Sequence, residues 1–92
     1  MKIEFEEHKD KLFEIILGEN HHDEFLRLID HLYANGKTKK EIYELFLVFL
    51  SEIQIDKRTK MNEKVYDNLS DFMDGFTSWG KGFKILPNEP DL

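Results

Sequence analysis

The side chains most able to do chemistry in this 92-residue chain are carboxylates and histidines, because cysteine is absent. That absence excludes disulfides, thiolate zinc sites and cysteine nucleophiles. His21 and His22 stand beside Asp23 and Glu24, in a run that resembles a cluster of metal ligands. Adjacent residues of a helix point about 100° apart, however, so these four cannot share one ion on one face. We expect no metal and no cofactor.

Nucleophilic catalysis and phosphate binding lack their usual motifs. The serines, Ser51, Ser70 and Ser78, stand outside any Gly-x-Ser-x-Gly elbow. The run Gly80-Lys81-Gly82 is too short for a phosphate-binding loop, and no predicted helix follows it. We therefore expect that the protein is not an enzyme.

Carboxylates recur at helical spacing in the C-terminal half of the chain. Glu63, Asp67, Asp71 and Asp74 are separated by four, four and three residues, and a similar row occurs in residues 4–14. This spacing places the side chains along one stripe of a helix, where like charges repel one another. The stripe is most simply a solvated helix face. Its functional interpretation is a ligand for the Arg and Lys side chains of a basic partner.

Trp79 ends the same segment, with Tyr66 and Phe83 nearby in sequence. Large aromatic side chains often anchor protein interfaces, but a tryptophan here could equally be a core residue that holds the C-terminal tail. Both interpretations of Trp79 stay open. The candidate partner-binding set is Glu63, Asp67, Asp71, Asp74 and Trp79.

Four helices are predicted to position these residues, because apolar side chains recur with a period of about 3.6 between turn signals. We expect them near residues 4–17, 20–35, 38–53 and 62–78, with a basic surface loop at 54–61. The fold class is therefore all-α, a compact bundle of about four helices. We expect one domain over residues 1–92, in which residues 81–92 form a tail. Phe83, Ile85 and Leu86 should fold back on the body before the chain frays after Pro87.

Local signals mark the ends of these helices. Thr38 and Glu41 form a capping box at the start of the third helix. Asn20 and Asn62 are expected N-caps, and Gly18 is an expected residue just beyond a helix C-terminus.

The third helix carries an unusually wide apolar surface. Leu47 and Val48 extend its apolar face almost all the way round, which indicates the central and most buried helix. Gly75, within the fourth helix, indicates either close packing or an early end.

Charge is spread unevenly over a net value of −6. Residues 1–36 carry −5, residues 37–64 carry +2 and residues 65–92 carry −3. An acidic protein is repelled by phosphate backbones, so we expect no nonspecific nucleic-acid binding and favour a basic protein partner. The acidic N-terminus does not resemble a signal peptide, and the longest apolar run, 45–50, is too short to span a bilayer. We expect a cytoplasmic protein with no membrane partner.

Size, acidity and helix number together resemble the small immunity proteins that bacteria make against their own nuclease toxins. Segments 24–29 (EFLRLI) and 80–84 (GKGFK) are similar to parts of the colicin-nuclease group. Segment 66–79 (YDNLSDFMDGFTSW) resembles the closing helix of some helical immunity proteins from contact-dependent inhibition systems. The Tyr-Tyr-Pro signature of the colicin-nuclease group is absent, so the binding residues of that group are not transferred to this chain.

The expected function is therefore non-enzymatic binding of a basic protein through an acidic surface. The resemblance implies that this partner is a cognate nuclease-type toxin, which the protein would neutralise. A helical adaptor or regulatory subunit is the first alternative, and a small DNA-binding regulator is the second. The oligomeric state stays open. The bases that suggest the DNA-binding alternative are Lys37, Lys39, Lys40, Lys57, Arg58, Lys60 and Lys64.

Overall fold

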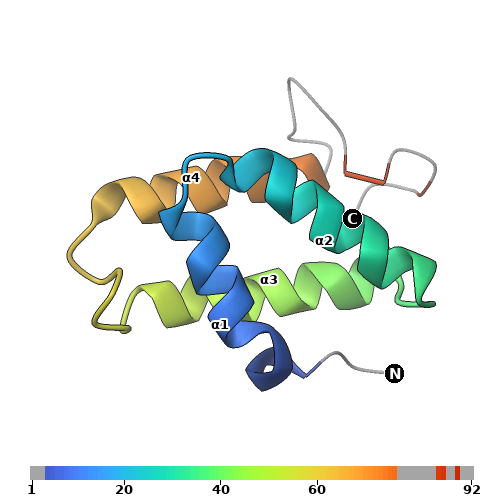
Figure 1. The fold of residues 1–92 in the computed structure, drawn as a ribbon, viewed down its shortest axis with the longest axis horizontal. Coiled ribbons are helices and arrows are strands. Elements are labelled where there is room, and N and C mark those ends of the chain that lie inside the picture. Colours follow the sequence, from blue (N-terminus) through green and yellow to red (C-terminus); the bar gives the residue numbers. More distant parts are fainter. Residues whose placement is uncertain (1–3, 77–84, 87–88, 90–92) are drawn as a thin grey trace.

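The computed structural model describes residues 4–76, 85–86 and 89 of the chain. Four α-helices follow one another in this part: α1 (Phe5–Leu17), α2 (His21–Ala34), α3 (Lys39–Ile53) and α4 (Glu63–Met73). A short 3-10 turn, η1 (Asp74–Phe76), continues α4. The described residues include no strand, which confirms the predicted all-α class (Figure 1).

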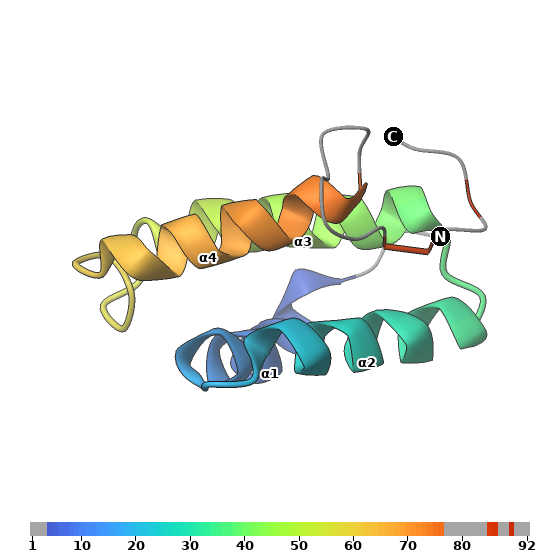
Figure 2. The ribbon, with the colours of Figure 1, turned by 90° about the horizontal axis from the view of Figure 1, so that it is seen from above.

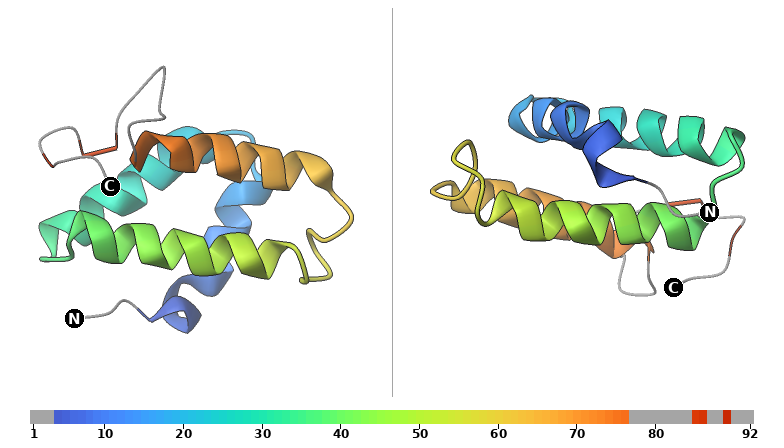
Figure 3. Two further views of the ribbon diagram at one scale, coloured as in Figure 1. Left: turned by 180° about the vertical axis from the view of Figure 1, so that it is seen from behind. Right: turned by 90° about the horizontal axis from the view of Figure 1, so that it is seen from below.

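The helices lie in two layers. Figure 2 shows α1 and α2 in one layer, and α3 and α4 as an antiparallel pair in the other. Within its layer α1 lies at a steep angle to α3 (Figure 1), and it packs against each of the other three helices. Seen from behind in the left view of Figure 3, α3 and α4 run side by side with no other helix in front of them. One face of this pair is therefore turned away from the rest of the described chain.

Phenylalanine rings from all four helices form the centre of the core. Phe25 of α2 packs edge-on against Phe46 of α3, with 5.2 Å between ring centroids, and lies 5.1 Å from Phe72 of α4. Phe13 of α1 packs edge-on against Phe49 of α3 at 5.1 Å. Burying each such ring contributes about 1.5–3 kcal/mol, and edge-to-face pairs add a further increment. This cluster joins the two layers.

The capping box predicted for the third helix is confirmed. The Glu41 amide donates to Thr38 Oγ1 at 3.1 Å, and the Thr38 amide donates to Glu41 Oε1 at 2.9 Å. The Asn62 cap is confirmed as well, because its Oδ1 accepts from the Lys64 amide at 3.1 Å. At the end of α2, Gly36 takes a φ of +91°, a left-handed conformation that glycine adopts without strain.

Two of the predicted helix ends differ in detail from the structure. Asn20 occupies the N-cap position of α2, but its side chain makes no capping hydrogen bond. Its ψ of 34° lies outside the extended region from which a cap side chain reaches the first turn. Gly18 has φ −89° and ψ 171°, so it ends α1 in extended backbone and is not a left-handed residue.

The prediction that α3 is the central and most buried helix is confirmed, because α3 has more buried residues than α1, α2 or α4. α3 does pack against α1, α2 and α4, which makes it the central helix. Leu47 and Val48 are nevertheless 40% and 38% exposed. The physical reason is the two-layer arrangement, which covers α3 on its inner side and along one flank only.

α4 ends before the predicted bound near residue 78, as the alternative of an early end at Gly75 allowed, and part of the tail follows the prediction. α4 ends at Met73, and Gly75 is buried within η1. The Ile85 amide donates to the Gly75 carbonyl at 2.8 Å, and the Ile85 side chain is fully buried. This part of the tail therefore folds back on the body. Phe83 and Pro87 lie outside the described residues.

Candidate functional site

The acidic stripe, defined as Glu63, Asp67, Asp71 and Asp74, lies along the outer side of α4 and η1. The buried residues of α4 are Val65, Leu69, Phe72 and Met73. With a period of 3.6 residues, the stripe falls on the side of the helix opposite to this buried face. All four carboxylate residues are exposed, so the structure brings them together on one surface.

Three carboxylates of the stripe have no role in holding the described fold together. Within residues 4–76, 85–86 and 89, the side chains of Glu63, Asp67 and Asp71 form no hydrogen bond or ion pair. Exposed carboxylates of this kind contribute little to the free energy of unfolding. Like charges one turn apart on a helix instead repel each other by a few tenths of a kcal/mol. Their negative charge is therefore available to a partner.

The aromatic member of the candidate set cannot be placed on this surface. Trp79 lies outside the described residues, so its assignment to the core or to an interface stays a prediction. Tyr66 does lie beside the stripe, one residue before Asp67, and it is 43% exposed. Sequence analysis named Tyr66 only as a neighbour of Trp79. It did not predict an exposed aromatic ring next to the acidic stripe.

Exposed apolar side chains also occur on the neighbouring helix. Leu47 and Val48 occupy the outer side of α3, and Ile55, just beyond its end, is 71% exposed. Sequence analysis noted Leu47 and Val48 only as a widening of the apolar surface of α3 and did not predict that they are exposed. The available signal was the width of the apolar surface of α3, which exceeds what one buried face requires.

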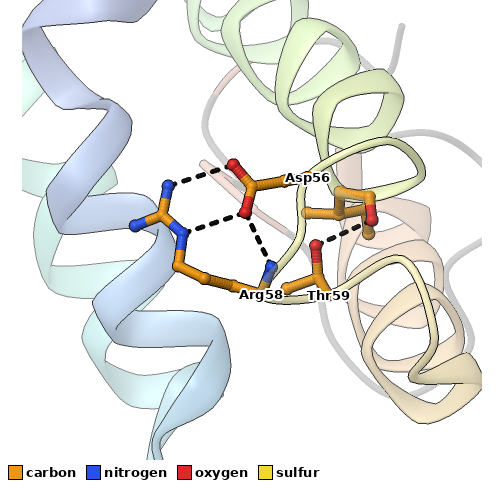
Figure 4. Close-up of polar contacts among 4 residues, drawn as sticks. Asp56, Arg58 and Thr59 are labelled. Carbon is orange, nitrogen blue, oxygen red and sulfur yellow. Dashed lines mark hydrogen bonds and ion pairs between the residues drawn. The ribbon is translucent and has the colours of Figure 1, made fainter.

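The basic loop at 54–61 is held in place by its own side chains (Figure 4). The Arg58 guanidinium donates to both oxygens of Asp56, at 3.0 Å and 3.2 Å. It also lies 3.9 Å from the ring centre of Phe13, a cation–π contact with α1. The buried Thr59 hydroxyl donates to the Ile53 carbonyl at 2.7 Å. Arg58 therefore fastens the loop to the body.

The hydrogen bonds from Arg58 hold the pKa of the Asp56 carboxyl at about 2, well below its usual value of 3.8. A shallow pocket of about 480 Å³ lies beside this loop. Its lining is of mixed charge, since Glu63 stands among the bases and Arg58 is bound to Asp56. The lining residues are Lys57, Arg58, Met61, Asn62, Glu63 and Lys64.

The second basic cluster of the sequence, Lys37, Lys39 and Lys40, does not form one exposed surface. Lys39 is only 4% exposed, at the first position of α3, whereas Lys40 is exposed. The histidines are likewise partly taken up by packing, with the His22 ring edge-on to Phe72 at 5.5 Å. Among the residues that the structure describes, no group of three His, Asp or Glu could hold a metal ion.

The described part of the chain contains no helix with the length and apolar character needed to cross a bilayer. Comparison of the chain with protein-family models, curated proteins and solved structures gives no match.

Proposed function

We propose that this protein binds a basic protein partner through the acidic stripe on α4, and that the partner is a toxin which it neutralises. The observation that carries the proposal is the position of four exposed carboxylates opposite the buried face of α4. Three of them have no partner within the described residues. The resemblance of segments 24–29, 66–79 and 80–84 to toxin-immunity proteins supports the identity of the partner.

Charge would act first on the rate of association. A net charge of −6 and a local row of carboxylates attract a basic surface from a distance and accelerate its encounter with the protein. Once the partner is bound, its Arg and Lys side chains make charge-assisted hydrogen bonds to the carboxylates as water is displaced. The same carboxylates stabilise the fold little, so they can be changed without unfolding the protein.

The test is a charge reversal, Asp67→Lys with Asp71→Lys, measured against each protein encoded by a neighbouring gene. We expect the affinity to fall by at least about 100-fold, since losing each desolvated charge pair costs several kcal/mol. The association rate of the unchanged protein should also fall steeply between low and high salt. Surface plasmon resonance at several salt concentrations measures both quantities.

The matched control is Glu14→Lys with Asp30→Lys, which makes the same change in net charge on exposed positions of α1 and α2. It should change the affinity far less than the α4 variant. Equal losses in the two variants would assign the effect to net charge and remove the stripe from the interface. Failure to bind any neighbouring gene product would instead favour a helical adaptor with a different partner.

A further inference from the structure

The outer side of α3 is an apolar surface that no described residue covers. Leu47 and Val48 are adjacent in sequence. Viewed along the axis of α3, both point away from its buried face, about 100° apart from each other. Ile55 lies two residues beyond the end of α3 and is 71% exposed. Isolated exposed apolar residues are common. Leu47 and Val48 lie on the side of α3 away from its buried residues, where Glu44 and Ser51 are also exposed. The left view of Figure 3 shows that one face of α3 and α4 is turned away from α1 and α2.

This apolar surface runs beside the acidic stripe. The Tyr43 ring contacts the Phe76 ring at 5.2 Å, so the flank of α3 that bears Tyr43 faces η1 and the end of α4. Leu47 stands one turn after Tyr43 and therefore on the α4 side of the exposed face. α3 and α4 are antiparallel neighbours (Figure 1). We call the exposed side chains of Leu47, Val48 and Ile55 the apolar track. The apolar track thus lies beside the acidic stripe of α4, where Tyr66 is also exposed.

We propose that the apolar track and the acidic stripe form one docking surface for an amphipathic basic segment of the partner protein. Its apolar side chains would lie over Leu47, Val48 and Ile55, and its Lys or Arg side chains would meet the acidic stripe. This inference rests on the proposed function and specifies the chemistry of the segment that the stripe receives. Amphipathic helices dock in this way, with anchors at helical spacing on one face and charge along the other.

The charge pattern selects this occupant over two others. A second copy of the chain related by a two-fold axis would present the same patch to itself. Its carboxylates would then face either the same carboxylates or the apolar side chains of the first copy, and both contacts leave the charges without bases. An anionic lipid surface would repel the stripe as well. A basic amphipathic segment satisfies the charge and the apolar surface together.

Three synthetic 15-residue peptides, matching the length of α3, provide the probes. One carries Leu and Lys at helical spacing, the second has Glu in place of Lys, and the third has Ser in place of Leu. Each is titrated into the ¹⁵N-labelled full chain and followed by NMR. We expect the Leu/Lys peptide to bind most tightly and to shift amide signals in both 47–55 and 63–74.

Leu47→Ser with Val48→Ser should weaken binding of the Leu/Lys peptide by roughly tenfold or more, because it removes the apolar anchors. Leu17→Ser, at an exposed apolar position of α1, is the control that should leave binding unchanged. Circular dichroism melting confirms that each variant is folded. The inference is overturned if the Leu/Lys peptide fails to bind, if the Glu peptide binds equally well, or if the α3 variant has no effect.

The outcome also separates this inference from the proposed function. If the Ser/Lys peptide binds as tightly as the Leu/Lys peptide, with shifts confined to α4, then the apolar track is not part of the surface and the acidic stripe still is. If the neighbouring gene product binds and is released by the Asp67→Lys and Asp71→Lys changes, while the α3 variant binds it normally, the proposed function stands without the apolar track.

Discussion

The carboxylates of this protein fall into two groups, those that form hydrogen bonds within the fold and those with no partner among the described residues. Glu41 and Asp56 are used by the fold, one to cap α3 and the other to hold Arg58. Both have a pKa of about 2, because backbone amides or a guanidinium donate to the charged form. Asp67 and Asp71, by contrast, have no side-chain partner among the described residues. The distinction marks which acids can be changed to test function and which would disturb the loop or the cap.

The first prediction concerns Asp56 and acid stability. The pKa of Asp56 is lower in the folded chain than its usual value of 3.8. Its ionised carboxylate therefore contributes fully to the free energy of unfolding above about pH 4, and this contribution is lost as the pH falls toward 2. Asp56→Asn should therefore lower the melting temperature at pH 6. Between pH 5 and pH 2 the melting temperature of this variant should decrease less than that of the unchanged protein. The remaining fall comes from groups such as Glu41. Melting curves followed by circular dichroism at several pH values provide the measurement.

Asp67→Asn is the matched control for this prediction, because it removes an exposed carboxylate with no described partner. Its melting temperature at pH 6 should equal or slightly exceed that of the unchanged protein, because the change relieves repulsion along the acidic stripe. A melting profile of Asp56→Asn identical to that of Asp67→Asn would contradict a structural role for the contact between Asp56 and Arg58.

At the scale of the helices, the third helix depends on its first turn. Thr38→Ala removes the hydroxyl that accepts from the Glu41 amide, and should cost about 1 kcal/mol of unfolding free energy. Thr38→Ser keeps the hydroxyl and should cost much less. Urea unfolding followed by far-UV circular dichroism measures both values. Equal losses for the two variants would mean that the methyl group of Thr38, and not its cap, stabilises α3.

Sequence reasoning was most accurate where the interactions are local. The capping box and the Asn62 cap depend on residues two or three positions apart, so their sequence patterns were sufficient. The stripe on α4 follows from the helical period alone. Asn20 shows the limit, because a cap also needs a backbone conformation that the preceding turn imposes. For these two caps and the stripe, the deciding contact or spacing lies within about one helical turn.

The position of Leu47 and Val48 could not be predicted in the same way. An apolar side chain on a helix can face the core or a partner, and the arrangement of the layers decides which. That arrangement depends on contacts between residues far apart, such as the ring pairs Phe25–Phe72 and Phe13–Phe49. The candidate site was therefore predicted for its acidic half only, and its apolar half came from the structure.

At the scale of the whole molecule, charges on opposite sides of the protein interact with one another when the salt concentration is low. The described chain measures 36 × 29 × 20 Å along its principal axes. The Debye length is about 30 Å at 0.01 M salt and about 10 Å at 0.1 M. At low salt every charge therefore interacts with most others, and a net charge of −6 opposes the compact state. The acidic stripe adds local repulsion between carboxylates one turn apart.

The last prediction follows from this repulsion. The melting temperature of the unchanged protein should rise by about 2–4 °C from low to high NaCl, since screening relieves a few tenths of a kcal/mol per repulsive pair. Asp67→Lys with Asp71→Lys should reduce this rise most, because it removes both the local and the long-range repulsion. Glu14→Lys with Asp30→Lys makes the same change in net charge and should reduce it less. A melting temperature that falls with added salt would mean that attractive ion pairs, such as that between Asp56 and Arg58, outweigh the repulsion along the acidic stripe.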